Sequence, residues 1–331
     1  MTPRAEHKKG GLTQMKFIKD FLNSGTAKQQ KRKRLGALLI SITAALLVVA
    51  LLVLAVFGIV GAIKNRGEEE VVEETGDKIP KGYTTTTFGP DQTYNGPLLL
   101  LDASHPYRGN ALKVFSESGS VYRATSPEGE SLYSVNGMKD IGFTEETINA
   151  FNQMMVAFYQ AKSTEGYVAG TLWIQNPASM SLNDSTKAML SAGYGIILTD
   201  GRDTAATIYD AETKKGKGVY AWLYENAAQY GFIQASTAEG EENIFRYVGL
   251  VHAKYMVDKN LSVADYLAKL SKETGPGDTL KYKVDGVSYE IYYIAPTFPH
   301  LIPEKGHHTV SGDNAGGYII TVNKTAQSEQ K

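Results

Sequence analysis

The chain has 331 residues, which is enough to bury a sizeable core in one or two domains. Charged residues make up 21% of it and the formal net charge is −1, so no overall basic bias points to nucleic acid as a partner. It contains no cysteine, which excludes disulfide bonds, cysteine-ligated zinc and thiol nucleophiles.

The N-terminal part of the chain is predicted to contain a membrane anchor. Residues 1–34 are polar and basic, and they precede residues 35–63, which hold no charged side chain and are mainly Leu, Val, Ala and Ile. That run exceeds the roughly 20 residues needed to cross a bilayer, and it is apolar on every face, so it predicts a single transmembrane helix. Basic residues before it and acidic residues after it place the N-terminus in the cytoplasm and the rest outside.

The next segment, residues 64–96, is acidic and then rich in Thr, Gly and Pro, which predicts an extracytoplasmic linker. The globular part is expected to open with a short apolar strand at residues 97–101. Further strands are predicted over residues 171–174, 195–200, 205–210, 245–248, 279–284, 288–295 and 317–322, and helices over residues 144–160, 184–192, 219–230, 250–258 and 261–271.

Local signals support several of these elements. Thr144 and Ser262 are plausible helix N-caps, and Asp285-Gly286 is a two-residue hairpin signal. The mixture predicts an α+β fold, with an antiparallel sheet and helices packed against it. We expect the main domain at residues 97–271, a C-terminal β-rich extension at 272–324 and a tail at 325–331.

Two phrases in the chain carry a resemblance to a known family. Tyr230 to Ile233 reads YGFI and Phe245 to Gly249 reads FRYVG, and the opening from Pro97 to Tyr107 is similar to a GPLxLVNxxHPY pattern. These resemble VanY-type D-alanyl-D-alanine carboxypeptidases, which are zinc enzymes that trim bacterial cell-wall stem peptides. The resemblance spans about residues 97–270 and implies a VanY-like carboxypeptidase fold.

The family's active-site motifs are only half present. Its SxHxxGxAxD motif aligns with residues 191–200, where Asp200 occupies the metal-ligand position and Gly193 stands at the histidine position. Its ExWH motif aligns with residues 241–244, where Glu241 occupies the position of the catalytic base and Ile244 replaces the second histidine. The resemblance therefore implies a vestigial base, a vestigial carboxylate ligand and the loss of both imidazoles.

Other features bear on the same site. The family's SGYRS-like phrase supplies an arginine for the substrate carboxylate, yet no cation occurs from Thr171 to Thr186, so the substrate-binding residues stay unknown. His252 follows Ile244 by eight residues and is not a replacement ligand. Without the resemblance, Asp200 reads as a turn acid, and Glu241 and Glu242 as a solvated loop pair.

Three functional hypotheses follow. The first is a membrane-anchored extracytoplasmic pseudoenzyme that no longer holds zinc and binds or scaffolds at the bacterial cell wall, with stem peptides of peptidoglycan or another envelope protein as partner. The second is an active stem-peptide carboxypeptidase whose metal ligands are rearranged among Asp200, Glu241, Glu242 and a histidine from the tail. The third is a structural envelope-assembly protein that uses the C-terminal sheet from Gly275 onward.

Overall fold

The computed structural model describes residues 79–110, 124–135, 142–201 and 207–325. These residues belong to one compact unit that begins at Lys78. The predicted transmembrane helix at residues 35–63 and the basic tail at 1–34 lie outside the described ranges. Within those ranges, no helix is both long and apolar enough to cross a membrane.

A five-stranded sheet forms the first layer of the fold. Its order is β2-β3-β4-β8-β7, and each neighbouring pair is antiparallel except β2 and β3, which are parallel. The strands are β2 (Ser134–Val135), β3 (Leu172–Ile174), β4 (Gly195–Asp200), β7 (Phe232–Gln234) and β8 (Ile244–Tyr247). Because side chains alternate along a strand, Ile196 and Leu198 face one side of the sheet and Ile197 faces the other.

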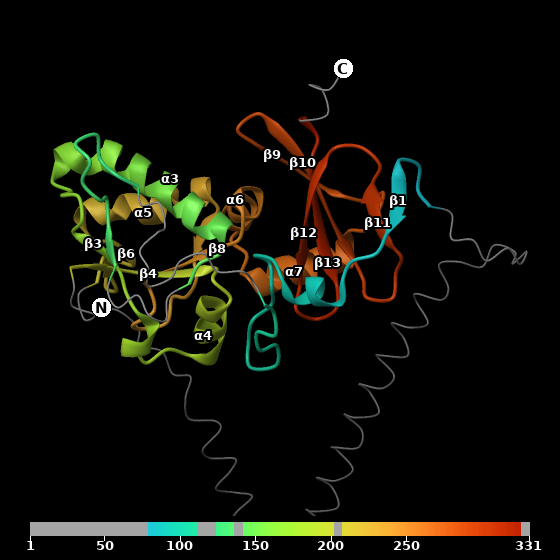
Figure 1. Ribbon diagram of the computed structural model, residues 1–331, viewed down its shortest axis with the longest axis horizontal. Helices are drawn as coiled ribbons and strands as arrows, with labels where there is room; N and C mark the ends of the chain where they lie inside the picture. Colours follow the sequence, from blue (N-terminus) through green and yellow to red (C-terminus); the bar gives the residue numbers. More distant parts are fainter. Residues whose placement is uncertain (1–78, 111–123, 136–141, 202–206, 326–331) are drawn as a thin grey trace, which may run out of the picture. The chain divides into compact units, whose positions relative to one another are not determined.

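Helix α3 (Glu145–Lys162) covers the Ile196 side of the sheet (Figure 1). The predicted N-cap is confirmed, since the Thr144 hydroxyl accepts a hydrogen bond from the Thr147 amide at 3.3 Å. Phe151 and Phe158 on its apolar face are fully buried against the sheet. This face therefore forms the main aromatic core.

The helix predicted over residues 219–230 is interrupted. It consists of α5 (Ala221–Asn226) between two 3-10 turns, Gly218–Tyr220 and Ala227–Tyr230. The Asn226 side chain donates to the Trp222 carbonyl, which competes with continued helix at this point. The predicted end at Gly231 is confirmed, with a left-handed φ of 82°.

Helix α4 (Asp184–Ser191) covers the Ile197 side of the sheet, together with the segment at residues 97–101. That segment was expected to be a strand and is not one, although Leu99 and Leu101 are buried. Its backbone groups have other partners: the Leu100 amide donates to the Asp313 carbonyl, and two of its carbonyls accept from the Arg246 side chain.

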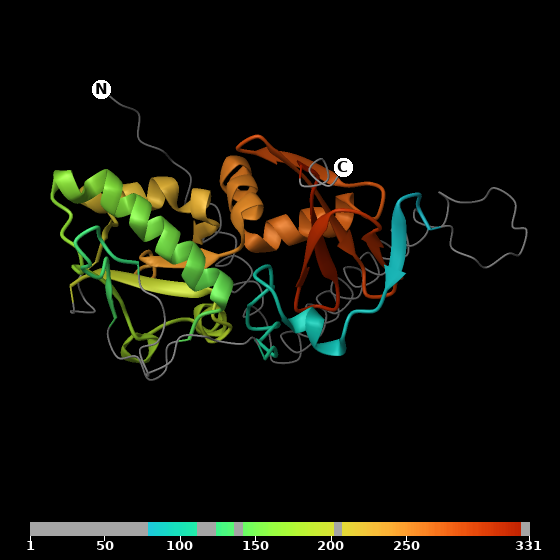
Figure 2. The same ribbon diagram turned by 45° about the horizontal axis from the view of Figure 1, so that its top comes forward.

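A second, four-stranded antiparallel sheet follows, in the order β12-β13-β10-β9. Its strands are β9 (Leu280–Val284), β10 (Val287–Ile294), β12 (His307–Gly312) and β13 (Tyr318–Asn323). Figure 2 shows α6 (Leu250–Lys259) and α7 (Val263–Glu273) beside these strands, and both helices share an apolar cluster with them. The hairpin predicted at Asp285-Gly286 is confirmed, with φ values of 49° and 86°.

Part of the segment expected to be a linker is structured. Strand β1 (Tyr83–Thr86) pairs with β11 (His300–Pro303), and a 3-10 helix follows at Pro90–Tyr94. Tyr83 contacts Tyr292 with ring centroids 5.7 Å apart, so aromatic burial draws this segment onto the second sheet. A short hairpin of β5 (Tyr209–Asp210) and β6 (Lys215–Gly216) completes the strands. The predicted α+β class is confirmed, with two main sheets where one was expected.

Candidate functional site

Glu241, at the predicted position of the catalytic base, is a buried carboxylate with only 4% of its surface exposed. One oxygen accepts from the Asn183 amide at 2.8 Å. The other accepts from Asn183 Nδ2 at 2.6 Å and from the Thr186 hydroxyl at 2.9 Å. Both oxygens are therefore occupied by residues at the start of α4.

The local sequence explains this arrangement. Asn183 is the N-cap of α4, and its Oδ1 accepts from the Thr186 amide at 2.8 Å, which turns its Nδ2 toward Glu241. Glu241 itself lies in a turn just before β8, where its amide donates to the Ala238 carbonyl. A negative charge is favourable at a helix N-terminus, so Glu241 stabilises α4 electrostatically as well.

Asp200, at the predicted ligand position, is the exposed last residue of β4. Its strand partner is Leu172, whose side chain belongs to the aromatic core under α3. Asp200 lies near Tyr220. Burial raises the pKa of Tyr220 to about 12, and the negative charge of Asp200 adds to that shift.

The sheet separates the positions that the family motifs bring together. Ile197 pairs with Ile244, so these two side chains share the face covered by α4. Asp200 comes three residues after Ile197 and shares the opposite face with Leu172. Glu241 contacts α4, on the Ile244 side. The structure therefore does not place Asp200 and Glu241 in one cluster.

The two positions aligned with histidines contribute no metal donor. Gly193 has a left-handed φ of 81°, and a Cβ added there would lie 3.0 Å from the Thr144 amide nitrogen. Ile244 is fully buried in an apolar cluster with Leu101 and Met189. Zinc sites need three or four nitrogen, sulfur or oxygen donors, and in the described ranges no group of three His, Asp or Glu side chains could hold a metal. The residues present do not fit a zinc ion.

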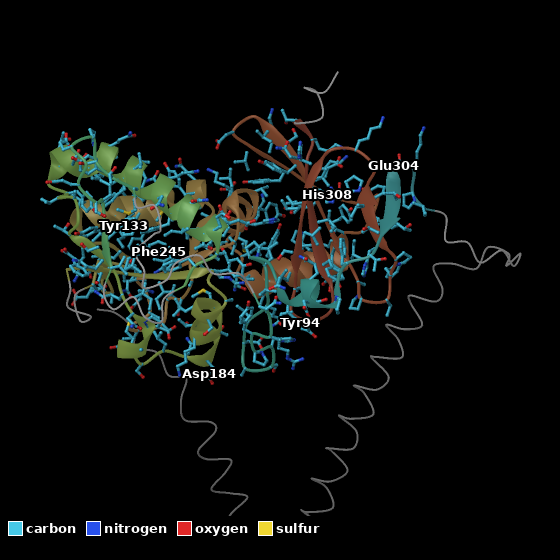
Figure 3. The ribbon with its side chains drawn as sticks, viewed as in Figure 1. Tyr94, Tyr133, Asp184, Phe245, Glu304 and His308 are labelled. Atoms are coloured by element: carbon cyan, nitrogen blue, oxygen red, sulfur yellow. The ribbon has the colours of Figure 1, made fainter. Side chains whose placement is uncertain are left out.

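The histidines lie elsewhere in the fold. His252 is buried in α6, where its ring nitrogens contact the hydroxyls of Tyr266 at 2.8 Å and Thr321 at 3.0 Å. His300 stacks on Phe88 with ring centroids 4.7 Å apart. Figure 3 places His308 on the four-stranded sheet, in β12 with His307. Each of these histidines belongs to, or packs on, the second sheet.

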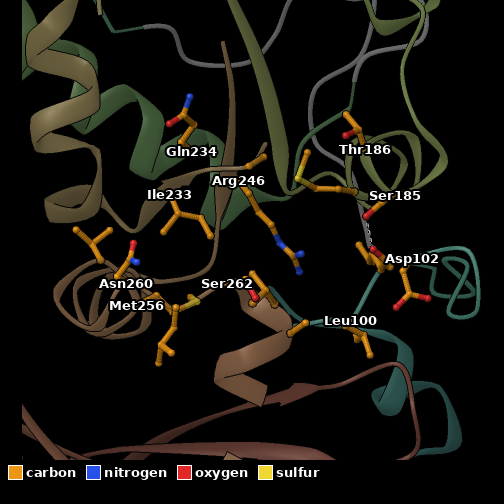
Figure 4. Close-up of a pocket in the computed structure, with 17 residues that line it drawn as sticks. Leu100, Asp102, Ser185, Thr186, Ile233, Gln234, Arg246, Met256, Asn260 and Ser262 are labelled. Carbon is orange, nitrogen blue, oxygen red and sulfur yellow. Dashed lines mark hydrogen bonds between the residues drawn. The ribbon is translucent and has the colours of Figure 1, made fainter. Parts of the chain in front are cut away.

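Arg246 is a residue that the sequence reasoning missed. It lies on β8 and lines a cavity of about 540 Å³ between the starts of α4 and α7 (Figure 4). Its Nη2 donates to the carbonyls of Pro97, at 3.1 Å, and Leu99, while its buried Nε has no partner among the described residues. Burial lowers the pKa of Arg246 to about 10. The sequence did contain a signal for it: Arg246 is the single charged residue in the predicted strand segment IFRYV.

Comparison with known proteins agrees with this architecture. No protein-family model matches the chain. A D-alanyl-D-alanine carboxypeptidase of Enterococcus faecium is 26% identical over 255 residues, which cover 71% of this chain and 78% of that protein.

Solved structures give the class of the fold. The vancomycin-resistance D,D-dipeptidase VanXYg, solved with a D-Ala-D-Ala phosphinate analogue, superimposes with a TM-score of 0.50 at 17% identity, over 73% of this chain and 99% of that one. A VanY D,D-pentapeptidase variant in complex with Zn(II) has a TM-score of 0.26 at 14% identity, over 52% of this chain and 98% of that one. The comparison with VanXYg shows an α+β fold similar to that of the VanX/VanY-type peptidases. In sequence, the chain is similar to a D-alanyl-D-alanine carboxypeptidase, which supports a VanY-type carboxypeptidase-like domain.

Proposed function

We propose that this protein is a membrane-anchored, extracytoplasmic VanY-like protein that binds peptidoglycan stem peptides without hydrolysing them. The E. faecium relative is a D-alanyl-D-alanine carboxypeptidase, and VanXYg was solved with a D-Ala-D-Ala analogue, which supports a stem peptide as the ligand class. The charge pattern around residues 35–63 supports the anchor and its orientation.

The observation that carries the loss of hydrolysis is the position of Glu241. A general base must be free to take a proton from the attacking water. Here both carboxylate oxygens accept hydrogen bonds from Asn183 and Thr186, and the side chain is buried. Glu241 therefore serves to hold the start of α4, through its hydrogen bonds with the N-cap Asn183 and with Thr186.

The metal positions support the same conclusion. A zinc peptidase needs three protein ligands and an open fourth position for water. Gly193 and Ile244 offer no donor atom, and Asp200 lies on the opposite face of the sheet from Ile244.

Metal content, activity and binding together test the proposal. The full-length chain, purified without a histidine tag and dialysed, is expected to hold far less than one zinc per chain by mass spectrometry. It should release no D-alanine from a pentapeptide that ends in D-Ala-D-Ala, yet bind that peptide in calorimetry. One tightly held zinc per chain, or turnover that a chelator stops, would show an active enzyme with rearranged ligands. Failure to bind the peptide would refute the stem-peptide assignment.

A further inference from the structure

Arg246 carries a buried positive charge that no described carboxylate neutralises. Its side chain is 7% exposed, and in the described part of the chain no carboxylate forms an ion pair with it. Burial lowers its pKa only to about 10, so the guanidinium stays protonated at neutral pH. Removing such a charge from water without a counter-charge is unfavourable.

The guanidinium also has an unused donor. Nη2 is held by the carbonyls of Pro97 and Leu99, but Nε is buried and makes no hydrogen bond within the described residues. A buried donor without a partner is destabilising. In Figure 4 the guanidinium extends into the cavity toward Ser262 and Leu100. An anion in the cavity would supply a counter-charge to the guanidinium.

The cavity has the make-up of a small-ligand site. Its volume of about 540 Å³ lies within the range of roughly 300–1,000 Å³ usual for such sites. Apolar side chains such as Leu100, Ile233 and Met256 form much of its wall. Asp102 also lines it, but its carboxylate is already held by the His105 ring at 3.0 Å and by backbone amides of Ser104 and His105.

The N-terminus of α7 adds a second feature that favours an anion. Ser262, Val263 and Ala264, the N-cap and the first two helical residues, line the same cavity as Arg246. Amides in the first turn of a helix have no partner within the helix, and the helix dipole is positive at that end. The Ser262 hydroxyl caps the Asp265 amide at 3.1 Å, which fixes the start of the helix.

We propose that this cavity is a receptor for one carboxylate attached to a small apolar group, bound between Arg246 and the start of α7. Two sources share that chemistry: a free organic acid, and the C-terminal carboxylate of a short peptide. Only the peptide source rests on the function proposed above. A carboxylate suits the site because it matches a guanidinium in charge and geometry.

Calorimetry on the full-length chain with three probes tests the chemistry. The probes are propionate, N-acetyl-D-alanyl-D-alanine and the C-terminal amide of that dipeptide. We expect at least one of the two carboxylates to bind, and the amide to bind at least about tenfold more weakly than its acid, the difference that 1.4 kcal/mol produces. Equal binding of acid and amide, or no binding of either carboxylate, would overturn the carboxylate receptor.

Matched variants in α7 separate the effect of a side chain's charge from the effect of its shape. Arg246 itself is kept, because its hydrogen bonds to the carbonyls of Pro97 and Leu99 support the fold. Ala264→Glu places a negative charge beside the cavity, at a helix start that tolerates acids. Ala264→Gln has the same shape without the charge, and Ala268→Glu puts the same charge on an exposed residue one turn further along that does not line the cavity.

The expected result is that Ala264→Glu binds the carboxylate at least tenfold more weakly than Ala264→Gln, which carries the same bulk, while Ala268→Glu stays within about twofold of wild type. Undiminished binding by Ala264→Glu would place the carboxylate elsewhere and refute the site. Binding of propionate without the dipeptide would support the receptor and count against the stem-peptide function. Binding of the dipeptide that Ala264→Glu weakens relative to Ala264→Gln would support both the carboxylate receptor and the stem-peptide function.

Discussion

At the scale of single residues, Glu241 occupies the position aligned with a catalytic base, and its carboxylate holds the start of α4. In a working zinc peptidase this position needs access to water, whereas here three donors from Asn183 and Thr186 converge on it. Catalytic bases are commonly held at some cost to stability, and their replacement is often neutral or stabilising. The stability of a Glu241 variant therefore distinguishes the two roles.

We expect Glu241→Gln to lower the free energy of unfolding by about 2–3 kcal/mol, because the new amide group faces a donor and the charged acceptor is lost. Urea denaturation measures this change. Glu242→Gln is the matched control: among the described residues that carboxylate accepts from the Gly240 amide alone, and it is partly exposed, so its loss should cost less than about 0.5 kcal/mol. Unchanged or increased stability of Glu241→Gln would contradict the role of Glu241 in holding the start of α4.

His252 gives a prediction about pH. Burial lowers its pKa from 6.5 to about 3, whereas the unfolded chain binds the proton at an ordinary pKa. A depressed histidine pKa means that its contribution to stability is complete above about pH 6.5 and is lost as the pH falls toward 3. The slope is at most about 1.4 kcal/mol per pH unit.

Between about pH 6.5 and pH 5, we expect wild type to lose about 2 kcal/mol more unfolding free energy than His252→Gln, because the variant lacks the titrating ring. Denaturant titrations of both proteins at the two pH values measure this difference. The contributions of other titrating groups are the same in wild type and variant, so they cancel. Parallel losses in the two proteins would show that His252 is not held neutral by the fold.

At the scale of elements, the turn between α4 and β4 depends on Gly193. Its φ of 81° is left-handed, its carbonyl accepts from the Thr144 amide at 3.1 Å, and an added Cβ would lie 3.0 Å from that nitrogen. Both strain and crowding oppose a side chain here, and the crowding is against backbone, which moves less readily than a side chain. A histidine is not accommodated at this turn in the present fold.

Gly193→Ala should therefore destabilise the protein by about 2–3 kcal/mol, combining left-handed strain with crowding. Gly240→Ala is the matched control, since Gly240 has the same φ of 81° but nothing within 4 Å of an added Cβ. It should cost only about 1–2 kcal/mol, the strain alone. Thermal or urea unfolding compares the two, and equal losses would show that crowding at Gly193 is absent.

Elements defined by local signals were predictable from the sequence. The N-caps Thr144 and Ser262, the end at Gly231 and the Asp285-Gly286 hairpin all follow from short-range chemistry, and each is confirmed. The segment at 97–101 was not, because its apolar run is buried without pairing in a sheet. Its carbonyls are satisfied by Arg246, nearly 150 residues away in the sequence, and no local pattern reports such a partner.

For the candidate site, the sequence predicted which positions align with the family's motifs, but not how their side chains are arranged. The resemblance located Asp200 and Glu241, but the face on which each side chain lies depends on the register of β3, β4 and β8. A shift of one residue reverses the face of every side chain in a strand, so motif spacing alone could not show that the sheet separates them. Arg246 was overlooked because its lack of a counter-charge is a property of the fold.

At the scale of the whole molecule, the described unit joins two sheets through α6 and α7. Leu98, from the opening segment, packs into the same apolar cluster as Val251 of α6 and Ile291 of β10. The region expected to be a C-terminal extension therefore shares a core with residues near the start of the domain. Truncation after residue 271 would expose that cluster.

The proposed topology places this whole unit outside the cytoplasm, and the absence of cysteine offers a direct test. A single cysteine can be introduced at Ser24, in the basic tail, or at Thr237, an exposed loop residue. In intact bacterial protoplasts that express the full-length chain, a membrane-impermeant maleimide should label Thr237→Cys at once. It should label Ser24→Cys only after permeabilisation, because the basic residues before the apolar run favour the cytoplasmic side. The cysteine-free parent gives the background. Labelling of Ser24→Cys in intact protoplasts, or protection of Thr237→Cys, would refute the extracytoplasmic orientation and with it any direct contact with the cell wall.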